Sequence, residues 1–146
     1  MNTIHDCRLL DLPLIGMPQG NITPVEARRD IPFAIARVFY LYDIPGGESR
    51  GGHAHRDLHQ VIVCVMGSFD VIVDDGKERR SIHLNRAYQA LHVPNTIWGE
   101  LVNFSSGAIC LVLASLPYQE SDYIRNYQQF VEYRAHGIPE SGGPQP

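Results

Sequence analysis

Two histidines separated by one residue, His53 and His55, are the side chains of this sequence best suited to chemistry. They follow a pair of glycines, and Arg50 stands just before the glycines. Residues i and i+2 of a strand point to the same face of a sheet, so we expect both imidazoles in one pocket with the Arg50 guanidinium at its rim. An arrangement of this kind suits either metal binding or proton transfer.

Short strands are the elements that must position these side chains. Apolar and β-branched stretches recur along the chain with turn signals between them, which is typical of a β-sandwich or barrel. The expected strands cover residues 7–10, 21–26, 36–42, 52–55, 59–66, 67–74, 78–84, 90–93, 97–104 and 108–115. Asp74-Asp75-Gly76-Lys77 predicts a hairpin turn. The sequence therefore predicts an all-β fold with a double-stranded β-helix, or jelly-roll, architecture.

A single short helix is expected near the C-terminus, over residues 121–133, with Ser121 as its cap. Its apolar positions recur at helical spacing and are Tyr123, Ile124, Tyr127, Phe130 and Val131. Residues 135–146 are rich in glycine and proline and are expected to form a flexible tail. We therefore expect one domain, residues 1–134, followed by this tail.

The composition excludes several classes of protein. A formal net charge of −4 argues against a general nucleic-acid binder. The longest apolar runs are too short to span a bilayer, and the N-terminus does not resemble a signal peptide. The three cysteines, Cys7, Cys64 and Cys110, are widely spaced, as expected of buried reduced thiols. These features predict a cytoplasmic protein that binds neither nucleic acid nor membrane.

The spacing of the histidines resembles the first motif of the cupin family. His53, His55 and Gly67 match that motif, whereas Pro94 and Asn103 match the second cupin motif. The resemblance implies the cupin form of the jelly roll for this chain.

Two of the four usual metal ligands of a cupin are missing from the sequence. The glutamate position reads Gln60, and the histidine position of the second motif reads Gly99. Divalent first-row metals need three or four good donors, so we expect neither a metal nor another cofactor. Substitution of the carboxylate by His59 keeps metal binding open as a lesser alternative. A purely structural role for His53 and His55 is another.

Without a metal, the two histidines are suited to general acid–base chemistry. Imidazole titrates near neutral pH and can take a proton from carbon and return it. The natural reaction is removal of a proton next to a ketone through an enediolate, in which the second imidazole or a tyrosine handles the oxygen proton. Arg50 is suited to hold a phosphate or pyrophosphate by bidentate contacts.

Taken together, the motifs are similar to those of bacterial nucleotide-sugar cupins, and most of all to the dTDP-4-keto-6-deoxyglucose 3,4-ketoisomerases. The similarity extends from about Leu10 to Tyr133. Its most specific segments are Arg37-Val-Phe-Tyr-Leu-Tyr-Asp43, Arg50-Gly-Gly-His-Ala-His55, His59-Gln-Val-Ile-Val-Cys-Val-Met-Gly-Ser68 and Glu120-Ser-Asp-Tyr-Ile-Arg125. Arg-Gly-x-His also resembles the motif of the related 3,5-epimerases.

The resemblance implies an isomerase that moves the carbonyl of a dTDP-linked 4-keto-6-deoxyhexose from carbon 4 to carbon 3. It implies His53 as the base at carbon 3, His55 as its partner and Arg50 as a phosphate anchor. Tyr40 is expected to stabilise the enediolate with His55, and Tyr42 is in phase with Tyr40 on one face of the expected strand. The product would supply an aminotransferase that makes a 3-amino sugar for polysaccharide biosynthesis.

Further residues are expected at the pocket or beside it. Trp98 is expected to stack on the thymine or the sugar, and His92 adds a third titratable ring where the family often has tyrosine. Phe39 lacks a hydroxyl that the family often carries at this position. Arg125 is expected to pair with Asp122 or Glu120 rather than to contact substrate.

Two other functions remain open from the sequence. A 3,5-epimerase would share the histidine base but invert ring carbons, and a non-catalytic cupin would bind the sugar nucleotide without turnover. The resemblance further implies a homodimer with exchanged N-terminal strands, because an exposed edge strand needs a cover.

Overall fold

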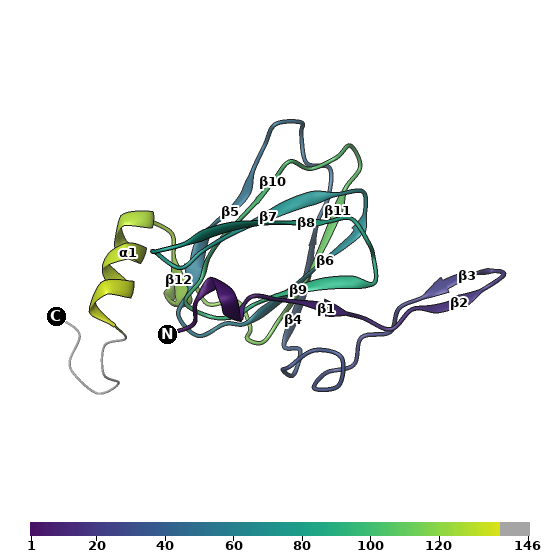
Figure 1. Ribbon diagram of the computed structural model, residues 1–146, viewed down its shortest axis with the longest axis horizontal. Helices are drawn as coiled ribbons and strands as arrows, with labels where there is room; N and C mark the ends of the chain where they lie inside the picture. Colours follow the sequence, from purple (N-terminus) through teal and green to yellow (C-terminus); the bar gives the residue numbers. More distant parts are fainter. Residues whose placement is uncertain (138–146) are drawn as a thin grey trace.

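The computed structural model describes residues 1–137, in which two β-sheets of five strands each face one another (Figure 1). The first sheet contains, in order, β1 (Arg8–Asp11), β9 (Gln89–Val93), β6 (Gln60–Met66), β11 (Ile109–Ala114) and β4 (Arg37–Leu41). The second contains β12 (Tyr123–Ile124), β5 (Arg50–His55), β10 (Trp98–Val102), β7 (Phe69–Asp74) and β8 (Arg79–Leu84). Every pairing of neighbouring strands is antiparallel. The predicted all-β jelly roll is confirmed.

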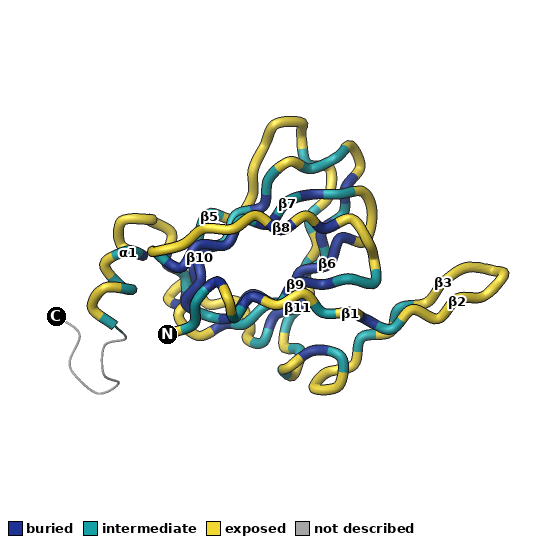
Figure 2. Tube along the Cα trace, in the orientation of Figure 1, coloured by how far each residue is buried: buried dark blue, intermediate teal, exposed yellow. Residues whose placement is uncertain are grey.

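The core lies between the two sheets because alternate residues of each strand point inward. Ile62 and Cys64 of β6 face Phe69, Val71 and Val73 of β7 within one buried cluster. Figure 2 shows the buried residues concentrated on the inner strands of both sheets. Part of this apolar interior also lines the cavity that carries the polar residues of the candidate site.

The turn predicted between β7 and β8 forms around Asp75. Its carboxylate accepts hydrogen bonds from the backbone N–H groups of Lys77 at 2.9 Å and Glu78 at 2.8 Å. Gly76 adopts a φ of +87°, a conformation that glycine reaches without strain. The same carboxylate accepts from the N–H of Ile4 at 3.0 Å and so ties the N-terminus to this hairpin.

A small hairpin, β2 (Ile15–Met17) and β3 (Gly20–Ile22), projects from one end of the molecule (Figure 1). The strand predicted over residues 21–26 is therefore too long, and β2 was not expected. Residues after the hairpin cover part of the outer face of the first sheet, where Val25, Ile31 and Phe33 pack in one cluster with outward-facing residues of β6 and β11.

The C-terminal helix begins later than predicted. α1 spans Tyr127–His136, and the side chain of Asn126 accepts a hydrogen bond from the N–H of Gln129 at 3.0 Å as its cap. Tyr123 and Ile124 belong instead to strand β12, which pairs with β5. Two single-turn 3₁₀ helices, η1 (Ile4–Asp6) and η2 (Glu120–Asp122), complete the fold.

The predicted flexible tail, residues 135–146, begins too early. Residues 135 and 136 form the end of α1. Residues 138–146 lie outside the described part of the chain. No helix within residues 1–137 is long and apolar enough to cross a membrane.

Candidate active site

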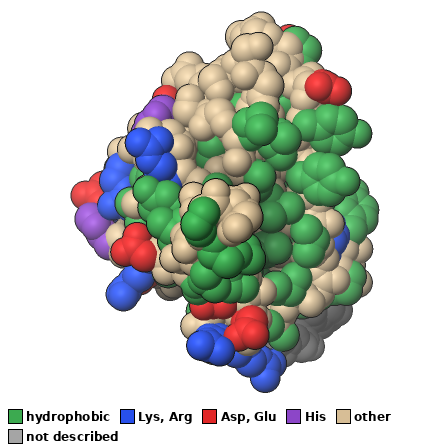
Figure 3. Space-filling view, turned by 90° about the vertical axis from the view of Figure 1, so that its right-hand side faces the viewer, with side chains coloured by type: hydrophobic (Ala, Val, Ile, Leu, Met, Phe, Trp, Pro, Cys, Tyr) green, Lys and Arg blue, Asp and Glu red, His purple; other side chains and the backbone are tan. Residues whose placement is uncertain are grey.

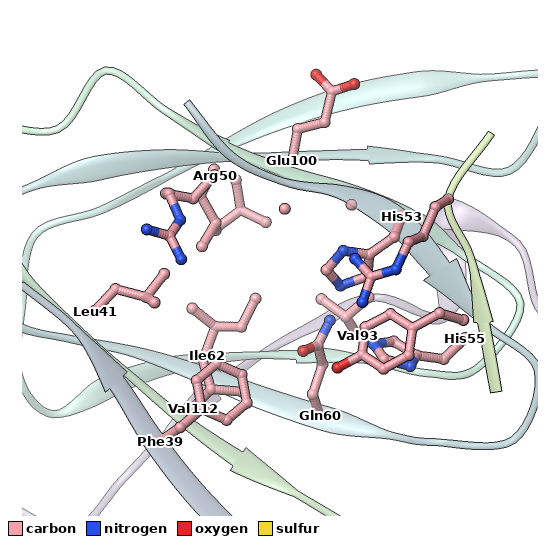
Figure 4. A pocket seen from close by; sticks show the side chains of 16 residues that line it. Phe39, Leu41, Arg50, His53, His55, Gln60, Ile62, Val93, Glu100 and Val112 are labelled. Carbon is pink, nitrogen blue, oxygen red and sulfur yellow. The ribbon is translucent and has the colours of Figure 1, made fainter. Parts of the chain in front are cut away.

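A cavity of about 240 Å³ opens between the two sheets and holds both histidines of the His-x-His segment. One wall is apolar, formed among others by Phe39, Leu41, Ile62 and Val112 (Figure 4). Its polar and charged lining residues are Arg50, His53, His55, Gln60, Glu100, Tyr123 and Arg125. Figure 4 shows Arg50 on one side of this space and His53 on the other. The predicted grouping of Arg50, His53 and His55 at one pocket is present.

A bulge in β5 brings Arg50 and His53 to the same cavity. Strict alternation would place residues 50 and 53 on opposite faces of the strand. Gly51 and Gly52 both adopt positive φ, +84° and +77°, and the register between β5 and β10 shifts between Gly99 and Glu100. The shift reverses the alternation, as β-bulges do. The glycine pair is therefore needed for the geometry of the site.

Replacement of Gly51 by alanine should disrupt this bulge. A Cβ at position 51 would lie 3.0 Å from the carbonyl oxygen of Gly99, in a backbone conformation that alanine rarely adopts. We expect a loss of about 1–3 kcal/mol of stability and a lower kcat/KM. The control is Gly52→Ala, which shares the positive φ but has no atom within 4 Å of the added Cβ. Equal losses in denaturant unfolding for the two variants would contradict the argument from close approach.

His55 is held by a buried carboxylate. Its Nδ1 lies 3.0 Å from Oδ2 of Asp122, and both side chains are under 10% exposed. Because a carboxylate only accepts hydrogen bonds, Nδ1 of His55 carries the hydrogen and Nε2 keeps its lone pair. The other oxygen of Asp122 accepts from the N–H of Asp57 at 2.7 Å. Sequence reasoning considered Asp122 only as a partner of Arg125 and missed this contact.

His53 is neutral at physiological pH. Burial, together with the neighbouring His55 and Arg125, lowers the pKa of its imidazole from 6.5 to about 4. The two imidazole rings meet edge to face with centroids 4.9 Å apart. Burial also lowers the pKa of His55, although Asp122 opposes this effect. A neutral imidazole in a cavity is able to accept a proton at neutral pH.

These shifts predict a loss of stability in mild acid. The pKa of His53 is about 4 in the folded chain and near its ordinary value of 6.5 in the unfolded chain, so the unfolded chain binds more protons between pH 4 and pH 6.5. Stability is therefore complete above pH 6.5 and falls as the pH approaches 4, by on the order of 3 kcal/mol from His53. Urea unfolding at several pH values measures the slope. The slope should decrease in His53→Asn; an unchanged slope in this variant would contradict the assignment.

Tyr123 is a residue of the cavity that sequence reasoning assigned to a helix. It pairs with His55 across β12 and β5, and its ring centroid lies 4.4 Å from that of His55 and 4.9 Å from that of His53. The available signal was the pattern Asn126-x-x-Gln129, which resembles a capping box and starts the helix after Tyr123.

Gln60 and Gly99, the two positions that depart from the cupin metal motifs, both line the cavity. The side-chain amide of Gln60 therefore takes the place of the carboxylate of a cupin metal site. Gly99 has only a hydrogen in place of the imidazole. His59, the possible substitute ligand, lies elsewhere, with Nδ1 3.2 Å from Nε2 of His92. Within residues 1–137, no group of three or more His, Cys, Asp or Glu side chains is arranged to hold a metal ion.

Tyr40 and Tyr42 do not lie at the cavity, contrary to the prediction. On β4 the side chains of Phe39 and Leu41 point inward, so the alternate residues point out. Tyr40 and Tyr42 are each 60% exposed on the outer face. The alternation of side chains along the strand was predicted correctly, but the wrong residues were predicted to point inward.

His92 is also outside the cavity. Val93, the next residue of β9, lines it, and His92 therefore faces the outer side of the sheet. There its ring stacks on that of His59, with centroids 5.4 Å apart, and lies 6.2 Å from the ring of Phe33. The predicted contact of His92 with substrate is absent from this geometry.

Trp98 is a core residue rather than a stacking platform. It is 4% exposed and packs with Ala54, Ile124 and Phe130 between the second sheet and α1. Its indole N–H donates to Glu100 at 3.0 Å. Arg125 pairs with Glu120 at 2.6 Å, as expected, and in addition reaches the cavity.

Comparison with known proteins gives this site a context. The family model described as FdtA, WxcM-like, C-terminal, matches residues 5–135. The chain belongs to this family. Over 117 residues it is 44% identical to the TDP-4-oxo-6-deoxy-alpha-D-glucose-3,4-oxoisomerase of Aneurinibacillus thermoaerophilus, covering 80% of this chain and 84% of that protein.

Solved structures of sugar 3,4-ketoisomerases share the fold of this family member. The enzyme QdtA from Thermoanaerobacterium thermosaccharolyticum, solved in complex with TDP, is 35% identical with a TM-score of 0.89, covering 91% of this chain and 97% of that chain. The TDP-quinovose 3,4-ketoisomerase WlaRB from Campylobacter jejuni is 41% identical with a TM-score of 0.84, covering 87% and 98%. The expected resemblance to 3,4-ketoisomerases is confirmed.

Proposed function

We propose that this protein is an isomerase that converts TDP-4-keto-6-deoxyglucose to its 3-keto isomer. The observation that carries the proposal is the neutral imidazole of His53, which faces Arg50 across the cavity between the two sheets in a chain that is 44% identical to an oxoisomerase. A base, an anion-binding cation and a partly apolar wall are the parts that proton transfer on a sugar phosphate ester requires.

His53 removes the proton from carbon 3 of the sugar, next to the carbonyl at carbon 4. The electrons of the broken C–H bond form a double bond between carbons 3 and 4, and oxygen 4 becomes the enediol oxygen. Return of a proton to carbon 4 and loss of the proton from oxygen 3 place the carbonyl at carbon 3. The electrons stay within the substrate and each proton removed is replaced, so the reaction needs no external oxidant or cofactor.

Arg50 anchors the diphosphate of the nucleotide. Among residues 1–137 its guanidinium makes no ion pair, whereas the charge of Arg125 is matched by Glu120 at 2.6 Å. An unmatched cation at the rim of a cavity binds an anion without first breaking a bond in the protein. His55, fixed by Asp122, holds His53 in place and helps to keep it neutral.

The test is incubation with TDP-4-keto-6-deoxyglucose in deuterium oxide, followed by proton NMR. A 3-keto sugar with deuterium at carbon 4 is the expected product. Exchange at carbons 3 and 5 with the carbonyl still at carbon 4 would indicate a 3,5-epimerase. Binding of TDP without any exchange would indicate a non-catalytic binding protein.

The protein is further proposed to be a homodimer in which the β2–β3 hairpin packs on the partner. Leu14, Ile15, Met17 and Ile22 are each about half exposed on or beside this hairpin. Figure 3 views the end of the molecule from which the hairpin projects and shows apolar side chains gathered over it. In the described residues β4 is an edge strand with one open side; it carries the exposed Tyr40, and the exposed Tyr42 follows it. Both surfaces are expected to be covered, because open apolar edges otherwise aggregate.

The dimer predicts a mass in light scattering twice that of one chain. Met17→Asp should shift the protein toward monomer, because a charge on the hairpin opposes its burial. Gln19→Asp adds the same charge in the exposed turn of the hairpin and should leave the dimer intact. A monomeric wild-type protein would contradict the proposal.

A cytoplasmic location is proposed as well. All three cysteines are free and buried in the described residues, as is usual in a reducing compartment. There the 3-keto product is a substrate for an aminotransferase, since a ketone is the group that such enzymes convert to an amine.

A further inference from the structure

Tyr123 lines the cavity directly beside the two histidines. Its ring contacts both histidines of the site, and the guanidinium of Arg125 lies over it, 4.2 Å from the ring centroid. Pairing of β12 with β5 fixes the backbone of Tyr123 opposite His55. Within residues 1–137, Tyr123 is the one tyrosine that lines the cavity.

Arg37 directs a cation at the hydroxyl of Tyr123. Nη2 of Arg37 donates to that hydroxyl at 3.4 Å. The guanidinium lies near the rings of Phe39 and Tyr118, at 5.1 and 5.5 Å from their centroids. No carboxylate pairs with Arg37 in the described residues, and its buried Nε has no hydrogen-bond partner there. The guanidinium of Arg37 therefore interacts with the hydroxyl of Tyr123 and forms no ion pair within residues 1–137.

The direction of this hydrogen bond leaves the O–H of Tyr123 available as a donor. A guanidinium only donates, so the oxygen of Tyr123 accepts from Arg37 and its own O–H remains free to donate elsewhere. If the phenol gives up its proton, the adjacent positive charge stabilises the phenolate that results.

Other polar residues of the cavity are less suited to transfer an oxygen proton. The hydrogen of His55 is on Nδ1 and bound to Asp122, so its free Nε2 can accept a proton but has none to give to oxygen 4, and the amide of Gln60 does not exchange protons in this way. Glu100 is engaged by Trp98 and Arg79, and Figure 4 shows its carboxylate directed away from the space between the labelled side chains. Phe39, which faces the cavity, has no hydroxyl.

We propose that Tyr123 is a catalytic residue that moves the hydroxyl proton from oxygen 3 to oxygen 4 of the sugar, and that Arg37 is its positioning residue. The inference rests on the proposed ketoisomerase function and assigns a step of it. As His53 removes the proton from carbon 3, the phenol gives its proton to oxygen 4 and becomes a phenolate. The phenolate then takes the proton from oxygen 3 as the carbonyl forms at carbon 3, and the imidazolium of His53, after exchange with solvent, returns a proton to carbon 4. The phenol is regenerated, and no proton is gained or lost.

Tyr123→Phe tests the catalytic role, because it keeps the ring contacts and removes only the hydroxyl. We expect kcat for TDP-4-keto-6-deoxyglucose to fall by about 10²- to 10³-fold, with KM and the Kd of TDP within about 3-fold of wild type. The matched control is Tyr40→Phe, which removes a hydroxyl on the outer face and should leave kcat unchanged.

Arg37→Met and Arg37→Lys test the positioning role. We expect the methionine variant to lose roughly 10- to 100-fold in kcat and the lysine variant to recover part of that loss, because lysine restores the charge. If Arg37 served only in packing, methionine and lysine would replace it equally well. Equal kcat values for the two variants would therefore overturn the role of Arg37.

The outcomes separate this inference from the proposed function. An active wild type with a Tyr123→Phe variant that retains kcat within about 5-fold would overturn the shuttle and leave the ketoisomerase intact. A variant that loses TDP affinity while kcat is unchanged would make Tyr123 a binding residue and also overturn the shuttle. A wild type without isomerisation would overturn both.

Discussion

His53→Asn is expected to lower kcat for TDP-4-keto-6-deoxyglucose by about 10³- to 10⁴-fold while TDP still binds. The imidazole is neutral because burial, His55 and Arg125 hold its pKa at about 4, so the wild-type base is ready at neutral pH. Asparagine retains a similar size and polarity but has no basic nitrogen. The measurement is turnover by NMR in deuterium oxide together with TDP binding by calorimetry.

The matched control is His92→Asn. The pKa of His92 is also about 4, mainly because of burial and the neighbouring His59, but the ring lies on the outer face of the first sheet. The two variants therefore share the chemistry of the substitution and differ in position. Activity should persist in His92→Asn, and comparable losses in both variants would mean that the cavity is not the reaction site.

The alternation of buried residues made most of the strands predictable. β6, β7, β8 and β11 each lie within one or two residues of the predicted bounds, because apolar side chains recur there with clear turns between them. The hairpin turn around Asp75 and Gly76 was equally clear. Local pattern fixes these elements because each strand is buried on at least one face.

The side of a strand that faces the cavity was harder to predict. Along β4 and the residue after it, aromatic and aliphatic side chains occur on both faces of the strand, so nothing in the sequence distinguishes Phe39 and Leu41 from Tyr40 and Tyr42. The same ambiguity holds on β9, where Val93 points inward and His92 outward. The choice is made by the packing of the opposite sheet, which no local pattern records.

The site itself combines local and distant contributions. The His-x-His spacing places His53 and His55 together without help, whereas Arg50 joins them only through the bulge at the two glycines. Asp122 and Tyr123 come from a segment nearly 70 residues later and reach the site because β12 pairs with β5. Sequence proximity could not reveal those contacts.

Asp122 should matter for both stability and activity. Its carboxylate accepts from Nδ1 of His55 at 3.0 Å and from the backbone N–H of Asp57 at 2.7 Å, in a site where both side chains are buried. Asp122→Ala leaves these donors without a partner, and we expect a loss of about 2–4 kcal/mol in the free energy of unfolding. The loss is measured by urea unfolding at pH 7, with Asp57→Ala as a control that removes a nearby exposed carboxylate.

Asp122→Asn separates orientation from stability. The amide oxygen can still accept from the N–H of Asp57, but the amide nitrogen then faces His55 and can only donate. His55 would have to accept at Nδ1 and carry its hydrogen on Nε2, the reverse of the wild-type tautomer. We expect a smaller loss of stability than in the alanine variant and a loss in kcat of roughly 10²-fold, since an inverted tautomer misplaces the partner of the base. Wild-type kcat in this variant would show that the Asp122–His55 pair serves the fold alone, because both tautomers of His55 would then support the reaction equally.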